Sequence, residues 1–206
     1  MTQDHAILMI AASELDSNLY YATRFIAPDP FVFLEVKGER IMVMSDLEMD
    51  RAKGEAAVDR VVSYSEVERT VKAGGVKEPG TIDVVHGFLQ PYGLRRLLVP
   101  SSFPYGYAVR LQELGYDLIT KKEPFFERRL VKTDEEVRHI EASQRATEEA
   151  VAAAHDALRN AVIRDGRLWL AGEPVTSESI KKLINVRLME RDCIAQHTIV
   201  AGGDQA

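Results

Sequence analysis

The 206-residue sequence has a single cysteine, no long hydrophobic run and no excess of positive charge. One cysteine, Cys193, excludes an internal disulfide and a zinc site built from several thiolates. The longest apolar run, residues 6–12, is far shorter than the roughly 20 residues that a membrane-spanning helix needs. Asp4 lies where a secretory signal would carry lysine or arginine. These absences predict a cytoplasmic protein with no membrane partner.

The charge balance argues against a nucleic-acid partner. The formal net charge is −6 and the sequence pI is about 5.5, whereas nucleic-acid-binding surfaces usually show a basic excess. A hydrophobic share of 46% with 28% charged residues is ordinary for a globular protein. A chain of this length can hold one large or two small domains.

Motifs for catalysis or cofactor binding are also missing. No Gly-x-Ser-x-Gly stretch is present, and residues 75–81 have the glycines and threonine of a P-loop but not its phosphate-binding lysine. Glu136 and His139 fit a Glu-x-x-His metal motif, but a di-iron helix bundle needs a second copy, which the sequence lacks. We therefore predict no catalytic, metal-binding or cofactor-binding residue in this chain.

The first 130 residues alternate short apolar runs with helical patterns. Strands are predicted at residues 6–11, 61–62, 97–99 and 117–119, with a hairpin over 31–45 that turns at the glycine of residues 37–39. Helices are predicted at residues 16–25, 46–53, 83–92 and 104–114. Alternation of this kind indicates an α/β domain, in which helices flank a mixed sheet.

A strong helix start marks a second domain. Thr133 and Glu136 have the spacing of a capping box, and Asp134 and Glu135 add negative charge where the helix dipole is positive. The apolar spacing continues to Val162, so one helix is predicted over residues 134–163. A second helix is predicted over residues 176–192.

This second part resembles an incomplete domain, because its one clear strand has no convincing partner. Residues 196–200 (QHTIV) are predicted to form a strand, yet no segment of 134–195 is a convincing partner for it; residues 168–170 offer at most a brief pairing. Such a strand either joins the sheet of the first domain, or pairs with a second copy of the chain, or has partners that are missing from this sequence.

Four segments, taken in order, resemble the creatinase, aminopeptidase P and prolidase family. Residues 18–25 (NLYYATRF) are similar to the family's N-x-x-Y-x-T-G-F segment, and residues 129–137 (RLVKTDEEV) to the linker R-x-x-K-[ST]-x-x-E-[IL]. Residues 176–187 resemble the second helix of the family's "pita-bread" peptidase domain, and residues 197–203 (HTIVAGG) resemble its first strand. The resemblance implies a creatinase-type amino-terminal domain over residues 1–131 and an incomplete α+β pita-bread segment over residues 132–206.

The resemblance also implies chemistry that lies outside this sequence. Complete family enzymes hold two divalent metal ions, such as Mn or Co, between two aspartates, one histidine and two glutamates, and these ions activate water. Those ligands follow the strand that residues 197–203 resemble, so none can be assigned here. The family usually has glycine where this chain has Arg24, so the helix before it must end without a residue that freely accepts positive φ.

Two functional interpretations follow from the resemblance. The first is the amino-terminal part of an Xaa-Pro aminopeptidase-like or dipeptidase-like metallopeptidase, which forms a homodimer and shapes the rim of the active site. Proline-containing peptides would then be substrates of a complete enzyme only, and the 206-residue chain itself is expected not to hydrolyse them. The alternative is a non-catalytic interaction module of the same architecture, as in histone-chaperone subunits. Coding sequence beyond residue 206 that supplies the five metal ligands would favour the first interpretation, and a natural stop the second.

Overall fold

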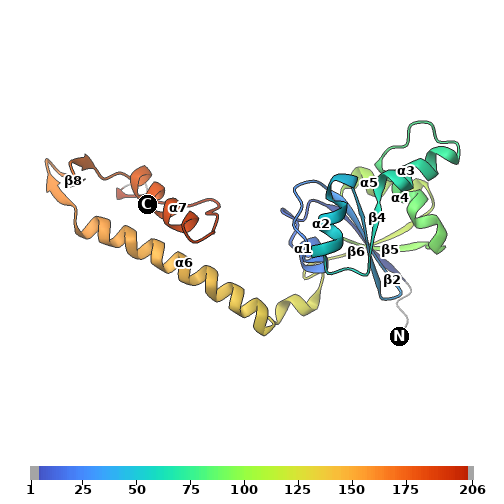
Figure 1. Cartoon of the computed structure of the whole chain (residues 1–206), viewed down its shortest axis with the longest axis horizontal. Helices are drawn as coiled ribbons and strands as arrows, with labels where there is room; N and C mark the ends of the chain where they lie inside the picture. Colours follow the sequence, from blue (N-terminus) through green and yellow to red (C-terminus); the bar gives the residue numbers. More distant parts are fainter. Residues whose placement is uncertain (1–4, 204–206) are drawn as a thin grey trace. The chain divides into compact units, whose positions relative to one another are not determined.

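The computed structural model describes residues 5–203 and divides the chain into two compact units, Met1–Leu130 and Val131–Ala206 (Figure 1). No helix in this described range is long and apolar enough to cross a membrane.

The first unit is built on a six-stranded mixed sheet with the order β4-β3-β2-β1-β5-β6. Strand β2 runs antiparallel to both of its neighbours, and the other adjacent pairs are parallel. The predicted α/β class with a mixed sheet is therefore confirmed. The strands are β1 (Ala6–Ala11), β2 (Phe31–Val36), β3 (Glu39–Met44), β4 (Arg60–Ser63), β5 (Arg96–Pro100) and β6 (Asp117–Lys121).

Helices cover both faces of this sheet because its strands are apolar on both sides (Figure 1). Alternate residues of β1 point to opposite faces, so Leu8 packs with α4 and α5 while Met9 packs with α1 and α2. The helices are α1 (Ser17–Thr23), α2 (Met49–Glu55), α3 (Tyr64–Ala73), α4 (Thr81–Leu89) and α5 (Tyr105–Glu113), with short 3₁₀ turns at Asp46–Glu48, Gln90–Tyr92 and Glu127–Leu130. Helix α3 was not predicted from the sequence.

Local chemistry sets the ends of α1. The Asp16 carboxylate accepts hydrogen bonds from the backbone N–H groups of Asn18 and Leu19 at 3.0 and 2.8 Å, which confirms the predicted N-cap. Arg24 ends the helix in the left-handed conformation, with φ of 53° and ψ of 21°. The helix therefore ends on a positive φ although glycine is absent from this position.

The β2–β3 hairpin turns through two residues of positive φ, Lys37 at 53° and Gly38 at 84°. Two-residue turns of this kind match the right-handed twist of the strands that they join. The predicted hairpin is confirmed.

The second unit begins with the long helix α6 (Asp134–Arg159). The Thr133 hydroxyl accepts from the backbone N–H of Glu136 at 3.2 Å, and the Glu136 carboxylate accepts from the N–H of Thr133 at 3.0 Å. This reciprocal pair confirms the capping box.

The predicted end of that helix at residue 163 is wrong. The helix stops at Arg159, and β7 (Val162–Arg164), β8 (Arg167–Leu170) and β9 (Glu173–Pro174) form a small antiparallel sheet. Asp165 and Gly166, with φ of 50° and 70°, make the turn between β7 and β8. Val162 fits the helical spacing of α6, but this two-residue turn places it in the strand instead.

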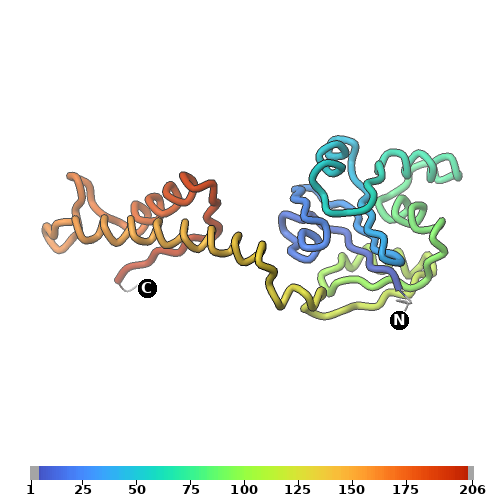
Figure 2. Tube along the Cα trace, turned by 60° about the horizontal axis from the view of Figure 1, so that its bottom comes forward, coloured from blue at the N-terminus to red at the C-terminus, as the bar shows by residue number. Residues whose placement is uncertain are grey.

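Helix α7 (Ser177–Met189) lies beside α6 (Figure 2). Small side chains on α6 allow this approach, since Ala146, Ala150 and Ala154 are buried, together with Ile180 of α7.

The predicted strand over residues 196–200 is wrong. The structure has no strand there, because the described strands pair only within the two sheets and offer this segment no ladder of backbone partners. His197 has a φ of 56°, which breaks an extended course. The Thr198 hydroxyl instead donates to the side-chain oxygen of Asn185 at 2.7 Å.

Candidate functional site

A polar network joins two distant segments at the carboxyl edge of the first sheet. Strands β1 and β6 run parallel with only β5 between them, so α1 and residues 122–130 leave the sheet at the same edge. The buried Asn18 donates from Nδ2 to Glu123 Oε1 at 2.7 Å and accepts at Oδ1 from Arg129. Arg129 also donates to the hydroxyl of Ser17 at 3.0 Å. The network thus connects residues 18–25 to the start of residues 129–137, two of the four family-like segments.

Glu123 is held ionised in this network. The backbone N–H of Phe125 donates to the second carboxylate oxygen at 3.0 Å and is the largest cause that lowers the pKa of Glu123 below its ordinary value. The Asn18 amide and the nearby Arg129 lower that pKa further. A carboxylate of lowered pKa holds no proton near neutral pH, so Glu123 is a hydrogen-bond acceptor rather than a general acid.

Three arginines surround one aromatic ring beside this network. The guanidinium carbons of Arg24, Arg128 and Arg129 lie 4.6, 5.3 and 5.8 Å from the centroid of the Tyr21 ring. We call these four residues the arginine–tyrosine patch. Guanidinium groups stacked on a ring bind by charge and planar contact, and such an arrangement is suited to recognition rather than to proton transfer.

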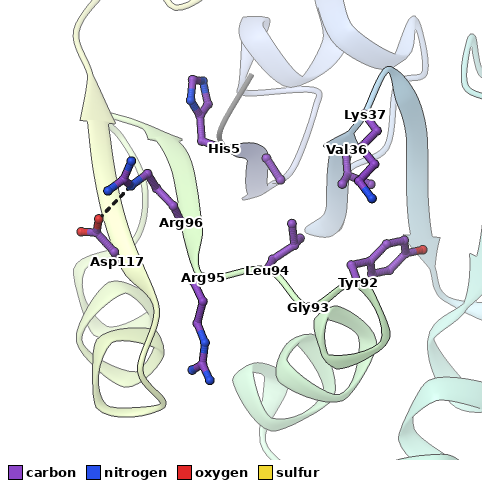
Figure 3. Close-up of a pocket in the computed structure, with 10 residues that line it drawn as sticks. His5, Val36, Lys37, Tyr92, Gly93, Leu94, Arg95, Arg96 and Asp117 are labelled. Carbon is purple, nitrogen blue, oxygen red and sulfur yellow. Dashed lines mark hydrogen bonds and ion pairs between the residues drawn. The ribbon is translucent and has the colours of Figure 1, made fainter. Parts of the chain in front are cut away.

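A pocket of about 570 Å³ lies at the opposite, amino edge of the same sheet (Figure 3). Its lining combines apolar side chains such as Val36 and Leu94 with charged ones. The charges do not converge in Figure 3: Arg96 turns toward Asp117, with which it forms an ion pair at 3.1 Å, and Arg95 points away from both. Open α/β sheets usually bind ligands at the carboxyl edge instead. This pocket therefore offers no focused anion site.

Residues 5–203 contain no group of three or more His, Cys, Asp or Glu side chains that could hold a metal ion. Glu136 and His139 of the Glu-x-x-His motif have different partners. The Glu136 carboxylate accepts from the N–H of Thr133 in the capping box, whereas His139 Nε2 lies 3.9 Å from Glu135 Oε1. His86 has two side-chain partners, the Tyr116 hydroxyl at 2.9 Å and Gln90 at 3.1 Å. Burial raises the pKa of Tyr116, so this phenol stays protonated and can donate.

Sequence reasoning missed the arginine–tyrosine patch. Arg129 stands out in the sequence only as part of the family-like linker and Arg24 only as a departure from glycine, and no local pattern shows that they share the Tyr21 ring with Arg128. The signal that could have found the patch is the pair of arginines that follows the aromatic residues Phe125 and Phe126, since arginines beside rings commonly stack on them.

Comparison with protein-family models gives no match. Comparison with curated protein sequences gives none either.

Solved structures do resemble the chain. The structure is similar to prolidase from Pyrococcus horikoshii, with a TM-score of 0.61 and 17% identity over 90% of this chain and 44% of that one. It is similar to X-Pro aminopeptidase from Thermotoga maritima, with a TM-score of 0.64 and 17% identity over 91% of this chain and 47% of that one. It is also similar to Xaa-Pro dipeptidase from Bacillus anthracis, with a TM-score of 0.65 and 17% identity over 90% of this chain and 44% of that one.

The chain spans less than half the length of each of these three structures. Its six-stranded mixed sheet with helices on both faces matches the amino-terminal domain of prolidase-type structures. The chain therefore has the fold of prolidase and X-Pro aminopeptidase structures, over part of their length.

Proposed function

We propose that this chain is the amino-terminal part of an Xaa-Pro peptidase of the prolidase and aminopeptidase P type. Complete members of this family are hydrolases that use two divalent metal ions. The observation that carries the proposal is the pattern of coverage: similar structures account for about nine-tenths of this chain, while the chain accounts for 44–47% of theirs. The order of the family-like segments along the sequence supports the same assignment.

In this proposal the 206-residue chain does not cleave peptides by itself. Two metal ions that share a water need several carboxylate and histidine ligands in one place. The residues that the structure describes bring no such group together. The chain's contribution is structural: its first unit forms a homodimer and shapes the rim of an active site whose metal ligands another segment supplies.

The hydrolysis test uses an Xaa-Pro dipeptide and a tripeptide with proline second, each with Mn²⁺ or Co²⁺. The Bacillus anthracis Xaa-Pro dipeptidase serves as the positive control for the dipeptide. We expect no release of amino acid above the rate without protein. Metal-dependent cleavage by the purified chain would contradict the proposal.

The dimer is tested separately by sedimentation equilibrium on the full chain. We expect a mass of twice the 23.1 kDa chain, independent of the metal added. A single-chain mass at all concentrations would contradict the proposed dimerisation role without affecting the family assignment.

A second candidate is a non-catalytic interaction module of the same architecture. The arginine–tyrosine patch favours this second candidate, because stacked guanidinium groups are suited to recognition rather than to catalysis. Sequencing the gene past codon 206 distinguishes the two, because the peptidase requires downstream codons for two aspartates, one histidine and two glutamates.

A further inference from the structure

Helix α6 has two apolar faces, and α7 covers only one of them. The covered face is the row of buried alanines described above. A second row of apolar side chains lies about 100° further around the helix and is exposed to solvent. We call this second row the α6 stripe; its members are Val137, Ile140, Val151 and Leu158, which are 41%, 54%, 41% and 41% exposed.

The α6 stripe has the spacing of a coiled-coil seam. Its residues fall in a repeat in which positions alternate by three and four residues, which is the pattern of helices that pack side by side. Gln144 and Thr147 occupy the two middle positions of the repeat. A polar residue in such a seam lowers stability but specifies how the two helices are aligned. The stripe is therefore suited to packing against another helix.

The two ends of α6 lead to opposite charges. The helix begins with Asp134 and Glu135, which are both exposed. The β7–β8 hairpin follows its other end, and there Arg164 and Arg167 lie directly opposite each other on the paired strands. Like charges in this arrangement destabilise a strand pair, and within residues 5–203 no ion pair neutralises either arginine. The hairpin therefore carries positive charge that lacks a counter-charge among the described residues.

The acidic start of α6 cannot supply that counter-charge within one chain. The helix has 26 residues and is about 39 Å long, and the hairpin lies at its far end (Figure 1). An antiparallel α6 from a second copy would bring each hairpin beside the acidic start of the other helix. A parallel pair would instead place like charges together at both ends.

We propose that the α6 stripe is a self-association surface on which α6 of a second copy packs in the antiparallel direction. The two stripes bury each other's aliphatic side chains, and Arg164 and Arg167 of each copy lie beside Asp134 and Glu135 of the other. An interface of this kind is two-fold symmetric, so each pairing occurs twice. The charge complementarity at the two ends selects a second copy as the occupant and sets its direction.

This contact lies in the second unit and goes beyond the homodimer role proposed for the first unit. Either contact, or both between the same two chains, gives a mass of twice the chain. The test must therefore locate the contact rather than count the copies.

The test is disulfide crosslinking between two full-length chains, one of which carries a tag that changes its size. Both chains carry Cys193→Ser, which removes the native thiol. Val137→Cys in one chain and Leu158→Cys in the other place thiols at opposite ends of the stripe, where an antiparallel pair brings them together. The matched control is Ala142→Cys with Ala152→Cys, because these exposed residues lie on other sides of α6.

In a glutathione redox buffer, we expect the mixed disulfide of the stripe pair to form at least about tenfold faster than that of the control pair, because alignment raises the effective concentration of the thiols. Adding Arg164→Glu and Arg167→Glu to both chains should slow it about tenfold, as several exposed charge pairs allow. Adding Asp134→Arg and Glu135→Arg to those chains should restore the rate to within about twofold, since the charge pairs are then re-formed with reversed sign. Thermal melts by circular dichroism check that every variant is folded.

Equal rates for the stripe and control pairs would overturn the proposal and leave the stripe for a different polypeptide. Faster crosslinking between two Val137→Cys chains than between Val137→Cys and Leu158→Cys chains would contradict the antiparallel direction. If the second charge reversal did not restore the rate, the hairpin and the acidic start of α6 would not meet, and the proposal would fail. Loss of the first-unit contact alone leaves the expected crosslink unchanged, so the two proposals are distinguished.

Discussion

Replacing Asn18 with alanine removes the amide that joins Glu123 to Arg129. The amide donates to the carboxylate at 2.7 Å and accepts from the guanidinium, and it is only 6% exposed. Both bonds involve charged groups, and each such bond contributes roughly 1.5–3 kcal/mol when water cannot replace it. Glu123 is exposed and Arg129 is half-buried, so water recovers part of that energy after the substitution. We expect Asn18→Ala to lower the free energy of unfolding of the first unit by about 2 kcal/mol.

Urea unfolding followed by far-UV circular dichroism measures this loss. Ser17→Ala is the matched control on the same helix, because it removes one exposed hydrogen bond to Arg129 and should cost about 0.5 kcal/mol. The chain has one tryptophan, Trp169 in β8 of the second unit, so the tryptophan fluorescence transition should not move in either variant.

The pH dependence provides a second readout of the same network. The pKa of Glu123 is lowered in the folded chain, so its contribution to stability is complete above the unfolded pKa and is lost as pH falls through the lowered folded pKa. The difference between wild type and Asn18→Ala should therefore narrow at acidic pH. The reasoning is refuted if Asn18→Ala costs no more than Ser17→Ala, or if the difference stays constant from pH 7 to pH 3.

Substitutions at three further local features test the account. Thr133→Ala should lower the free energy of unfolding by about 1 kcal/mol, and Glu136→Ala should lower it by less. A thermal melt of the double variant should show a loss smaller than the sum of the two, because the residues form one reciprocal cap. Additive losses would contradict the capping box. Arg24→Gly should leave the urea midpoint nearly unchanged, because glycine removes the cost of the left-handed backbone and so offsets the lost contact with the Tyr21 ring. Arg24→Ala loses the same contact but keeps the backbone cost, so it should lower the midpoint. Equal effects of the two variants would contradict this reasoning. Gly87→Ala should destabilise the first unit by about 1–3 kcal/mol, because the new Cβ would overlap Cγ2 of Val71 on α3. The loss should shrink in a Val71→Ala background, and a harmless Gly87→Ala would show that α3 moves freely.

Local rules were sufficient for much of the fold. Strand β1 follows from an uninterrupted apolar run, the N-cap of α1 from Asp16, and the start of α6 from the reciprocal spacing of Thr133 and Glu136. The partners of both helix caps lie within three residues, so those patterns are visible in the sequence. The apolar run of β1 is visible too, although its partners in β2 and β5 are distant.

Errors occurred where the outcome depends on distant or missing neighbours. Residues 196–200 have the composition of a strand, but a strand requires backbone partners, and the described sheets supply none. Val162 continues the apolar spacing of α6. It nevertheless lies in β7, because the turn at Asp165 and Gly166 allows β7 to pair with β8.

The candidate site could not be predicted for the same reason. Asn18 is separated from Glu123 by 105 positions and from Arg129 by 111, and only the parallel arrangement of β1 and β6 brings them together. The sequence identified residues 18–25 and 129–137 as significant through a family resemblance, but not that they touch.

The metal content of the chain tests the proposed function most directly, because the proposal assigns the peptidase metal site to another segment. The full chain is incubated with Mn²⁺, Co²⁺ or Zn²⁺, dialysed, and analysed for bound metal per chain by plasma mass spectrometry. The account predicts no stoichiometric metal, since no described group of side chains has the ligands of a closed site. One or two equivalents of metal retained per chain would contradict it and would place a complete metal centre within these 206 residues.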